Sequence, residues 1–127
     1  MSYNFLKTPY LYRYIRSADE LNFVMENGII YSFNPAGTHW TTLLTNDPKY
    51  AQQRLSLPEP PLYRIGGFML KDVDPSYIKY KGTVAPAYGQ IGGAEEIVLT
   101  VPIPILSIFD LKSKNLVSCI LHLKNKY

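Results

Sequence analysis

The order of the predicted secondary-structure elements constrains the fold of this chain more than any other feature. From residue 62 onward the chain carries only β-like apolar runs, separated by Gly- and Pro-containing turns, and both helical patterns come before that point. The predicted strands of this half are 62–70, 76–80, 95–101, 103–109 and 116–123, with a Gly-, Ala- and Pro-rich loop at 82–93. Because strands and helices do not alternate regularly, we expect an α+β fold in which two short helices accompany mostly antiparallel strands.

The first helix has the clearest local signals. It follows a strand pattern of aromatic and branched residues at 10–15. Ser17 and Glu20 have the spacing of a capping box, in which the serine caps the helix. An apolar stripe at helical spacing comes next, and Gly28 follows it. These signals predict a helix over 18–27.

The second helix is expected between two prolines. The segment before it is predicted to hold, in order, a strand at 29–31, a turn at 34–37 and a strand at 39–44. Asn46 or Asp47 can cap a helix that has Pro48 in its first turn, where a missing N–H costs nothing. That helix must stop before Pro58, because the residue before a proline disfavours helical backbone.

The composition fits one globular domain that spans residues 1–127. Hydrophobic residues make up 46% of the chain and charged residues 18%, which excludes a disordered or collagen-like protein. Lys and Arg number 13 against 10 Asp and Glu, and the net charge of +3 allows a nucleic-acid partner without requiring one. The single cysteine, Cys119, excludes an internal disulfide framework and a cysteine-based zinc cluster.

No segment is predicted to enter a membrane. The longest apolar run, 97–109, is interrupted by Pro102 and Pro104 and is shorter than the roughly 20 residues that a spanning helix needs. The N-terminus lacks the charged and apolar regions of a signal peptide. We therefore expect a small soluble domain.

Three groups of polar side chains stand within apolar strand patterns. Arg13 lies between two tyrosines, where its planar guanidinium suits a phosphate or a carboxylate. Thr41 and Thr42 end the run HWTT, and their hydroxyls can orient another side chain. Glu95 and Glu96 open an apolar strand, so one carboxylate is expected to face the working surface of the sheet and the other the solvent. Each group also has a purely structural interpretation: an edge-strand arginine, good strand formers and a solvated acidic pair.

Taken in order, these groups resemble the Arg–Ser–Glu class of mono-ADP-ribosyltransferases, and in particular the compact toxin domains at the C-termini of bacterial polymorphic toxins. The segments LYR at 11–13, WTT at 40–42 and GGAEEIVL at 92–99 are similar to the three motifs of that family. The resemblance covers about residues 11–109. It implies an ADP-ribosyltransferase-like split β-sandwich with two short helices, and an enzyme that uses NAD+ as its substrate and no metal.

The resemblance implies that Glu96 is the catalytic glutamate, because it directly precedes the hydrophobic run IVL. Cleavage of the nicotinamide–ribose bond develops oxocarbenium character, which a nearby carboxylate stabilises. Arg13 and Thr41 complete the implied catalytic set, and Glu95 is the alternative glutamate. The position two residues before Glu96, which is Gln or Glu in the arginine-modifying members, is Ala94 here. The resemblance therefore does not imply an arginine acceptor.

The implied NAD+-binding residues come from the same motifs. Arg13 would hold the phosphate or ribose side of NAD+ by charge-assisted hydrogen bonds. Thr41 and Thr42 would orient the glutamate and the ribose hydroxyls. The rest of the implied binding set is Tyr12, Trp40 and Glu95. A tyrosine such as Tyr50 or Tyr88 can stack on nicotinamide or adenine, and the sequence does not select one.

Other classes of function remain open on the sequence. An NAD+ hydrolase would use water in place of the acceptor at the same site. A metal-independent RNase would need a general acid and a general base, for which His39 and His122 are the only histidines. A non-catalytic binding module would need only the basic charge balance and the tyrosines.

The resemblance also implies a biological setting. The natural chain would be longer, with this domain secreted or delivered as the C-terminal part of a bacterial effector used in competition. The domain would act in the cytoplasm of the target cell. Its expected partners are a macromolecular acceptor, either protein or nucleic acid, and a cognate immunity protein that covers the NAD+ cleft.

Overall fold

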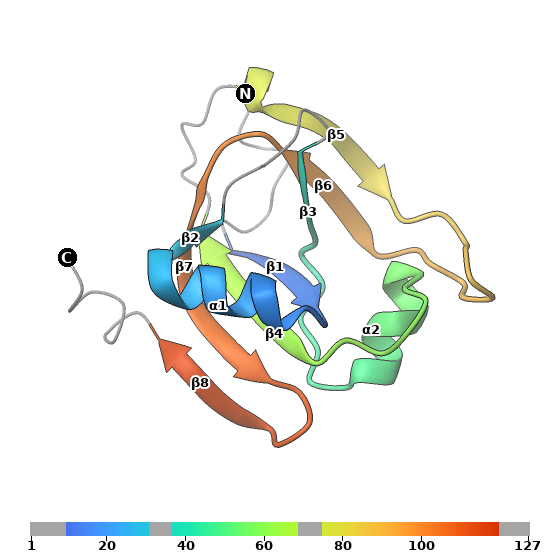
Figure 1. Ribbon diagram of the computed structural model, residues 1–127. Helices are drawn as coiled ribbons and strands as arrows, with labels where there is room; N and C mark the ends of the chain where they lie inside the picture. The colour runs from blue at the N-terminus through green and yellow to red at the C-terminus, as the bar shows by residue number, and fades with distance from the viewer. Residues whose placement is uncertain (1–9, 31–36, 69–74, 120–127) are drawn as a thin grey trace.

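The computed structural model describes residues 10–30, 37–68 and 75–119, which form two β-sheets and two α-helices (Figure 1). The elements in chain order are β1 (Tyr10–Ile15), α1 (Ala18–Asn27), β2 (Ile29–Ile30), β3 (Thr38–Trp40), α2 (Pro48–Leu55), β4 (Tyr63–Phe68), a 3-10 turn (Pro75–Tyr77), β5 (Ile78–Thr83), β6 (Glu95–Leu99), β7 (Ile103–Asp110) and β8 (Asn115–Cys119). The predicted α+β class with two helices is confirmed.

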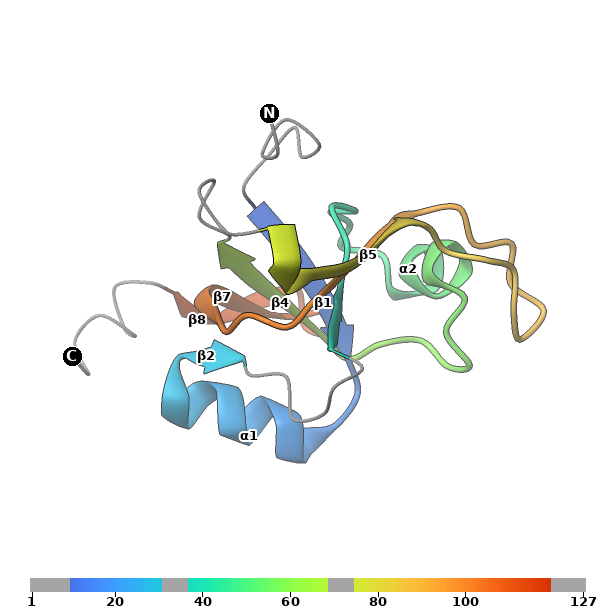
Figure 2. The same cartoon turned by 90° about the horizontal axis from the view of Figure 1, so that it is seen from above.

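The strands form a five-stranded and a three-stranded sheet, and neighbouring strands run antiparallel. In the larger sheet the order is β1-β4-β7-β2, with β8 also paired to β7. In the smaller sheet the order is β3-β6-β5, so β6 is its central strand. Figure 2 shows α1 on one side of the larger sheet and α2 beside the loop that joins β5 to β6.

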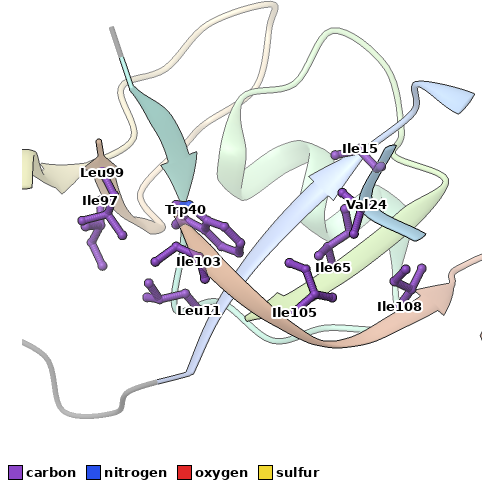
Figure 3. Close-up of a cluster of buried hydrophobic side chains, with 10 residues drawn as sticks. All are labelled: Leu11, Ile15, Val24, Trp40, Ile65, Ile97, Leu99, Ile103, Ile105 and Ile108. Atoms are coloured by element: carbon purple, nitrogen blue, oxygen red, sulfur yellow. The ribbon is translucent and has the colours of Figure 1, made fainter. Parts of the chain in front are cut away.

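One hydrophobic core joins the two sheets and α1. Its buried members, drawn in Figure 3, are Leu11, Ile15, Val24, Trp40, Ile65, Ile97, Leu99, Ile103, Ile105 and Ile108. Trp40 reaches from β3 toward the larger sheet, where Gly67 of β4 lies against it: a Cβ on Gly67 would stand 3.1 Å from the indole and 2.6 Å from Ile103 Cγ2. The sheets therefore approach each other closely at a position where only glycine fits.

An isolated β-bridge connects the two sheets directly. Tyr12 of β1 and Thr41, the residue after β3, exchange backbone hydrogen bonds of 2.8 and 2.9 Å. Because Arg13 follows Tyr12, the bridge brings Arg13 next to the end of β3. This junction is the structural basis of the candidate site.

Helix α1 begins and ends as the sequence predicts. The Ser17 hydroxyl accepts the backbone N–H of Glu20 (3.1 Å), and Gly28 closes the helix in the left-handed region with φ 72°. Val24 is fully buried in the core, with Leu21 and Met25 packed beside it. The predicted helix over 18–27 is confirmed.

Helix α2 is capped by Asp47, so the structure selects this residue over Asn46. One carboxylate oxygen of Asp47 accepts the backbone N–H groups of Lys49 and Tyr50 at 2.9 and 3.4 Å. Pro48 is the first helical residue, and the helix ends at Leu55, before Pro58, as predicted.

The Gly-rich loop between β5 and β6 folds back on α2. Its tip is a two-residue turn at Tyr88 and Gly89, closed by backbone hydrogen bonds of 2.8 and 3.2 Å between the flanking residues. The N–H of Gly92 donates to the carbonyl of Gln53 in the last turn of α2 (2.8 Å). The loop is thus anchored just before Glu95, where β6 begins.

Three predicted strands differ from the structure by two residues or more at one end or both. The strand expected over 95–101 ends at Leu99. The strand expected over 39–44 ends at Trp40, because Thr41 pairs with β1 instead of continuing in the smaller sheet, and its hydroxyl then accepts the Leu43 N–H (3.1 Å) in a tight turn. The strand expected over 76–80 starts two residues later and continues to Thr83, because residues 82 and 83 pair with the start of β6. Predictions for residues 31, 34–36, 69–70 and 120–123 lie outside the described residues.

Candidate functional site

A cleft of about 330 Å³ opens where β1, β3 and β6 meet near α2. Its polar part carries Arg13, His39 and Glu96. Its apolar part is formed by the side chains of Leu55, Leu57 and Val84, and its other lining residues are Tyr12, Tyr14, Trp40 and Thr41. Five of the seven residues expected at the site therefore line one cleft: Tyr12, Arg13, Trp40, Thr41 and Glu96.

Strand pairing explains why residues far apart in the chain meet here. The Tyr12–Thr41 bridge aligns β1 with the end of β3. Trp40 then pairs with Ile97, which aligns β3 with the start of β6. Arg13 follows Tyr12 and Glu96 precedes Ile97, so both charged side chains reach the same junction.

Arg13 is already extensively hydrogen-bonded. Its Nε and Nη2 donate to the two carboxylate oxygens of Glu20 at 2.6 and 3.1 Å, and its Nη1 donates to the backbone carbonyl of His39 at 3.2 Å. A guanidinium has five N–H donors. These three bonds therefore leave one N–H on Nη1 and one on Nη2 without a bond to these partners.

Glu96 is held by His39 across the smaller sheet. The imidazole Nδ1 lies 2.7 Å from a carboxylate oxygen of Glu96. The Glu96 side chain is 23% exposed and the His39 side chain 60% exposed, so the histidine stands on the solvent side of the pair. The contact restricts the orientation of the Glu96 carboxylate, which lines the cleft.

Glu95 takes part in a separate set of contacts. One of its carboxylate oxygens accepts the Thr42 hydroxyl at 2.7 Å, and the other lies 3.6 Å from Lys81 Nζ. Neither Glu95 nor Thr42 lines the cleft. Adjacent residues of a strand point to opposite faces, which agrees with Glu96 alone facing the cleft. Glu95 is not simply solvated, however, because it has a hydroxyl and an ammonium partner.

The two threonines have different roles: Thr41 bonds to the backbone, and Thr42 bonds to a carboxylate. Thr41 is buried and its hydroxyl accepts the Leu43 N–H, so it shapes the turn after β3. Thr42 orients Glu95 and makes no such bond to Glu96. The expected hydroxyl-to-glutamate contact therefore exists, but it involves the alternative glutamate.

Tyr14 forms a rigid part of the cleft wall. Its hydroxyl donates to the Leu43 carbonyl (2.7 Å) and accepts the Thr45 N–H (3.0 Å). Burial raises the pKa of Tyr14 above its usual value, because the phenolate would lose hydration. The wall thus keeps a neutral phenol that fixes the segment after Thr41.

The two tyrosines named as stacking candidates do not line the cleft. Tyr50 lies on α2 and Tyr88 at the tip of the Gly-rich turn, and both are exposed. Tyr80 is the tyrosine nearest the start of β6 in register: its hydroxyl lies over Gly82, where a Cβ would collide with it, and Gly82 pairs directly with Glu96. The sequence offers no signal for this, because it depends on the register of β5 against β6.

Glu20 is the main site residue that the sequence interpretation missed. Its position in the capping box accounts for its backbone N–H, which Ser17 accepts, but not for its carboxylate, which pairs with Arg13. The available signal was an acid seven residues after Arg13, across a short strand-to-helix turn. The sequence interpretation gives His39 a role only in an RNase, and the second histidine of that interpretation, His122, lies outside the described residues.

The chain shows no match to protein-family models, to curated proteins or to solved structures. Within residues 10–30, 37–68 and 75–119, no group of three or more His, Cys, Asp or Glu side chains is arranged to hold a metal ion. In the same ranges no helix has the length and apolar character needed to cross a membrane. The function is therefore inferred from the cleft residues and their geometry.

Proposed function

We propose that this domain is a mono-ADP-ribosyltransferase that cleaves the nicotinamide–ribose bond of NAD+ and transfers ADP-ribose to a macromolecule. The observation that carries the proposal is that Arg13 and Glu96 line the same cleft. A cation for the diphosphate and a carboxylate for the reacting ribose are the two charged groups that this chemistry needs. The two sheets and their antiparallel pairing suit an ADP-ribosyltransferase-like split β-sandwich, which is part of the proposal.

Arg13 supplies the end of the cleft that binds the diphosphate of NAD+. Its two remaining N–H groups can donate to phosphate oxygens while the other three hold it in place. The guanidinium suits this task because its planar donor geometry matches a phosphate group. The apolar wall of Leu55, Leu57 and Val84 provides a surface of the kind that covers a base ring.

Glu96 supplies the catalytic end. When the C–N bond breaks, nicotinamide leaves with the bonding electron pair and positive charge develops on the ribose. The carboxylate of Glu96 stabilises that charge, and His39 keeps the carboxylate oriented in the cleft. The acceptor nucleophile then bonds to the ribose carbon and loses its proton.

NAD+ hydrolysis is the same chemistry with water as the acceptor. The cleft residues serve either outcome, so the products decide between them. Transfer leaves ADP-ribose covalently attached to protein or nucleic acid, whereas hydrolysis releases free ADP-ribose.

The His39–Glu96 contact favours a metal-independent RNase as a second candidate. An imidazole and a carboxylate 2.7 Å apart, beside Arg13, form an acid, a base and a cation in one cleft. Such a site would take a proton from an RNA 2′-hydroxyl and return one to the leaving oxygen. Under this alternative, cleavage of RNA would be lost on His39→Ala and would require no NAD+.

We also propose the biological setting of a delivered bacterial toxin. The domain would act in the cytoplasm of the target cell, and an immunity protein would protect the producer by covering the cleft. Expression without such a partner should arrest growth in the wild type but not in Glu96→Gln. Healthy growth of cells that accumulate soluble wild-type protein would contradict the toxin assignment.

The decisive experiment uses NAD+ labelled in the adenylate and, separately, in the nicotinamide. The protein is incubated with each substrate and a cell lysate, and the protein, nucleic-acid and small-molecule fractions are separated. Transferase activity predicts nicotinamide release with adenylate label on a macromolecule, absent in Glu96→Gln. Free labelled ADP-ribose alone would establish hydrolysis, and intact NAD+ with shortened RNA would establish the RNase.

A further inference from the structure

We propose that Glu20 is a positioning residue for Arg13, and that it holds the guanidinium ready to bind a diphosphate. The proposal rests on the proposed function only in naming the diphosphate of NAD+ as the natural ligand. The main support is the pair of hydrogen bonds that the Arg13 guanidinium donates to the Glu20 carboxylate, at 2.6 and 3.1 Å.

The Glu20 carboxylate comes from a rigid part of the molecule. Glu20 stands in the first turn of α1, where its own backbone N–H is fixed by the Ser17 hydroxyl. The next residue, Leu21, packs against the hydrophobic core. A carboxylate held in this way can fix the plane of the guanidinium, which a solvent-exposed acid on a loop could not do.

The contact occupies one edge of Arg13 and leaves another available. Glu20 takes the Nε and Nη2 side, and the His39 carbonyl takes one donor of Nη1. The remaining N–H groups belong to a guanidinium that no longer rotates freely. An arginine side chain has high rotamer entropy, so holding it before the ligand arrives reduces the cost of binding.

The charge of Glu20 makes it possible to tell whether this residue positions Arg13 or only neutralises it. Glu20 compensates the positive charge of Arg13, so the site would bind an anion mainly through directed hydrogen bonds. If Glu20 only masked Arg13, its removal would strengthen anion binding. If Glu20 positions Arg13, its removal weakens binding despite the added positive charge. The two roles predict opposite signs.

The test titrates inorganic pyrophosphate into the wild type, Glu20→Gln, Arg13→Ala and the double variant, with binding measured by calorimetry. We expect the dissociation constant to rise about tenfold in Glu20→Gln, in line with the freedom regained by the arginine. In the Arg13→Ala background, Glu20→Gln should not weaken binding further, because no arginine remains to be positioned. Asp19→Asn is the matched control, because this exposed acid lies in the same helical turn and is not paired with Arg13 in the structure.

Unchanged or tighter pyrophosphate binding in Glu20→Gln would overturn the proposal, and so would absence of binding in the wild type. The chemical shift of the Arg13 Nε–H should also change in Glu20→Gln, while the rest of the NMR spectrum remains that of the folded protein. In NAD+ turnover, Glu20→Gln should raise KM about tenfold and leave kcat nearly unchanged. Pyrophosphate binding that follows this pattern in a protein that does not cleave NAD+ would reject the proposed function and keep the positioning role.

Discussion

The imidazole Nδ1 of His39 lies 2.7 Å from a carboxylate oxygen of Glu96, across the neighbouring strands β3 and β6. Both residues line the cleft, and Glu96 is the less exposed of the two. The histidine therefore limits the orientations that this carboxylate can adopt. Under the proposed function, the pair links the geometry of the smaller sheet to the stabilisation of the developing ribose cation.

Replacing Glu96 by Gln removes the negative charge while preserving the size of the side chain. Nicotinamide release at saturating NAD+ should fall about a hundredfold or more, the range for losing one preorganised electrostatic group. NAD+ affinity should change little, because the charge matters most in the transition state. Glu95→Gln is the matched control and should be milder, since Glu95 contacts Thr42 and lies outside the cleft. An inactive Glu95→Gln with an active Glu96→Gln would reverse the assignment.

Replacing His39 by Ala releases the Glu96 carboxylate without removing its charge. We expect kcat for nicotinamide release to fall about tenfold, less than in Glu96→Gln, because the stabilising group remains but is poorly oriented. The double variant supplies the check: if His39 acts through Glu96, His39→Ala should add almost nothing in the Glu96→Gln background. Full additivity of the two substitutions would show that His39 acts independently of Glu96.

Replacing Arg13 by Ala should weaken NAD+ binding with the fold retained. A lost hydrogen bond to a charged group costs about 1.5–3 kcal/mol, so the dissociation constant should rise at least tenfold. Arg16→Ala is the control, because Arg16 lies outside the cleft and pairs with Glu59 on the surface. Calorimetry with NAD+ measures the binding, and thermal melting verifies the fold. Unfolding of the Arg13 variant alone would make its role structural.

Replacing Tyr14 by Phe should lower the stability and change its dependence on pH. The Thr45 N–H and the Leu43 carbonyl would lose their partner, at a cost of about 1–3 kcal/mol. The pKa of Tyr14 is raised in the folded protein, so its contribution is fully present below the unfolded pKa near 10 and is lost as the pH rises through the folded pKa. Denaturant unfolding of both proteins should be measured between about pH 8 and about pH 11. The difference between their free energies of unfolding should shrink as the pH rises.

Replacing Gly67 by Ala should destabilise the junction of the two sheets. The added Cβ would meet Ile103 Cγ2 at 2.6 Å and the Trp40 indole at 3.1 Å, both in the core. Overpacking of this kind costs about 1–3 kcal/mol. Gly82→Ala provides the contrast, because its Cβ would meet only the far end of the half-exposed Tyr80 side chain, which can move. Equal melting temperatures for the two variants would contradict the close approach at Gly67.

The parts of the fold that the sequence predicts well are those set by local chemistry. The Ser17 cap, the Gly28 end and the Asp47–Pro48 start all act within one helical turn, so short spacing is sufficient to locate both helices. The α+β class follows from element order alone. The end of β3 at Trp40 was not predictable, because it depends on the bridge that Thr41 makes to a strand far back in the chain.

The candidate site shows the same division. The sequence predicts Arg13 and Glu96 as site residues, and the structure brings both to one cleft. Their immediate partners were not predicted, because the Arg13–Glu20 contact depends on how α1 lies beside β1, and the His39–Glu96 contact depends on strand register. Thr42 is predicted to orient the catalytic glutamate, but it bonds to Glu95, because Glu95 and Glu96 point to opposite faces of β6.

Strand β6 is central in its sheet, and both of its neighbours, β3 and β5, precede the turn at Tyr88 and Gly89. A chain divided at that turn would carry Arg13 and His39 on one fragment and Glu96 on the other. Neither fragment would contain the full set of charged groups. The first would present unpaired edges on β2, β3, β4 and β5, whose partners β6 and β7 lie on the second. The domain is therefore suited to fragment complementation, in which two inert halves regain a complete cleft when β6 and β7 insert between their partner strands.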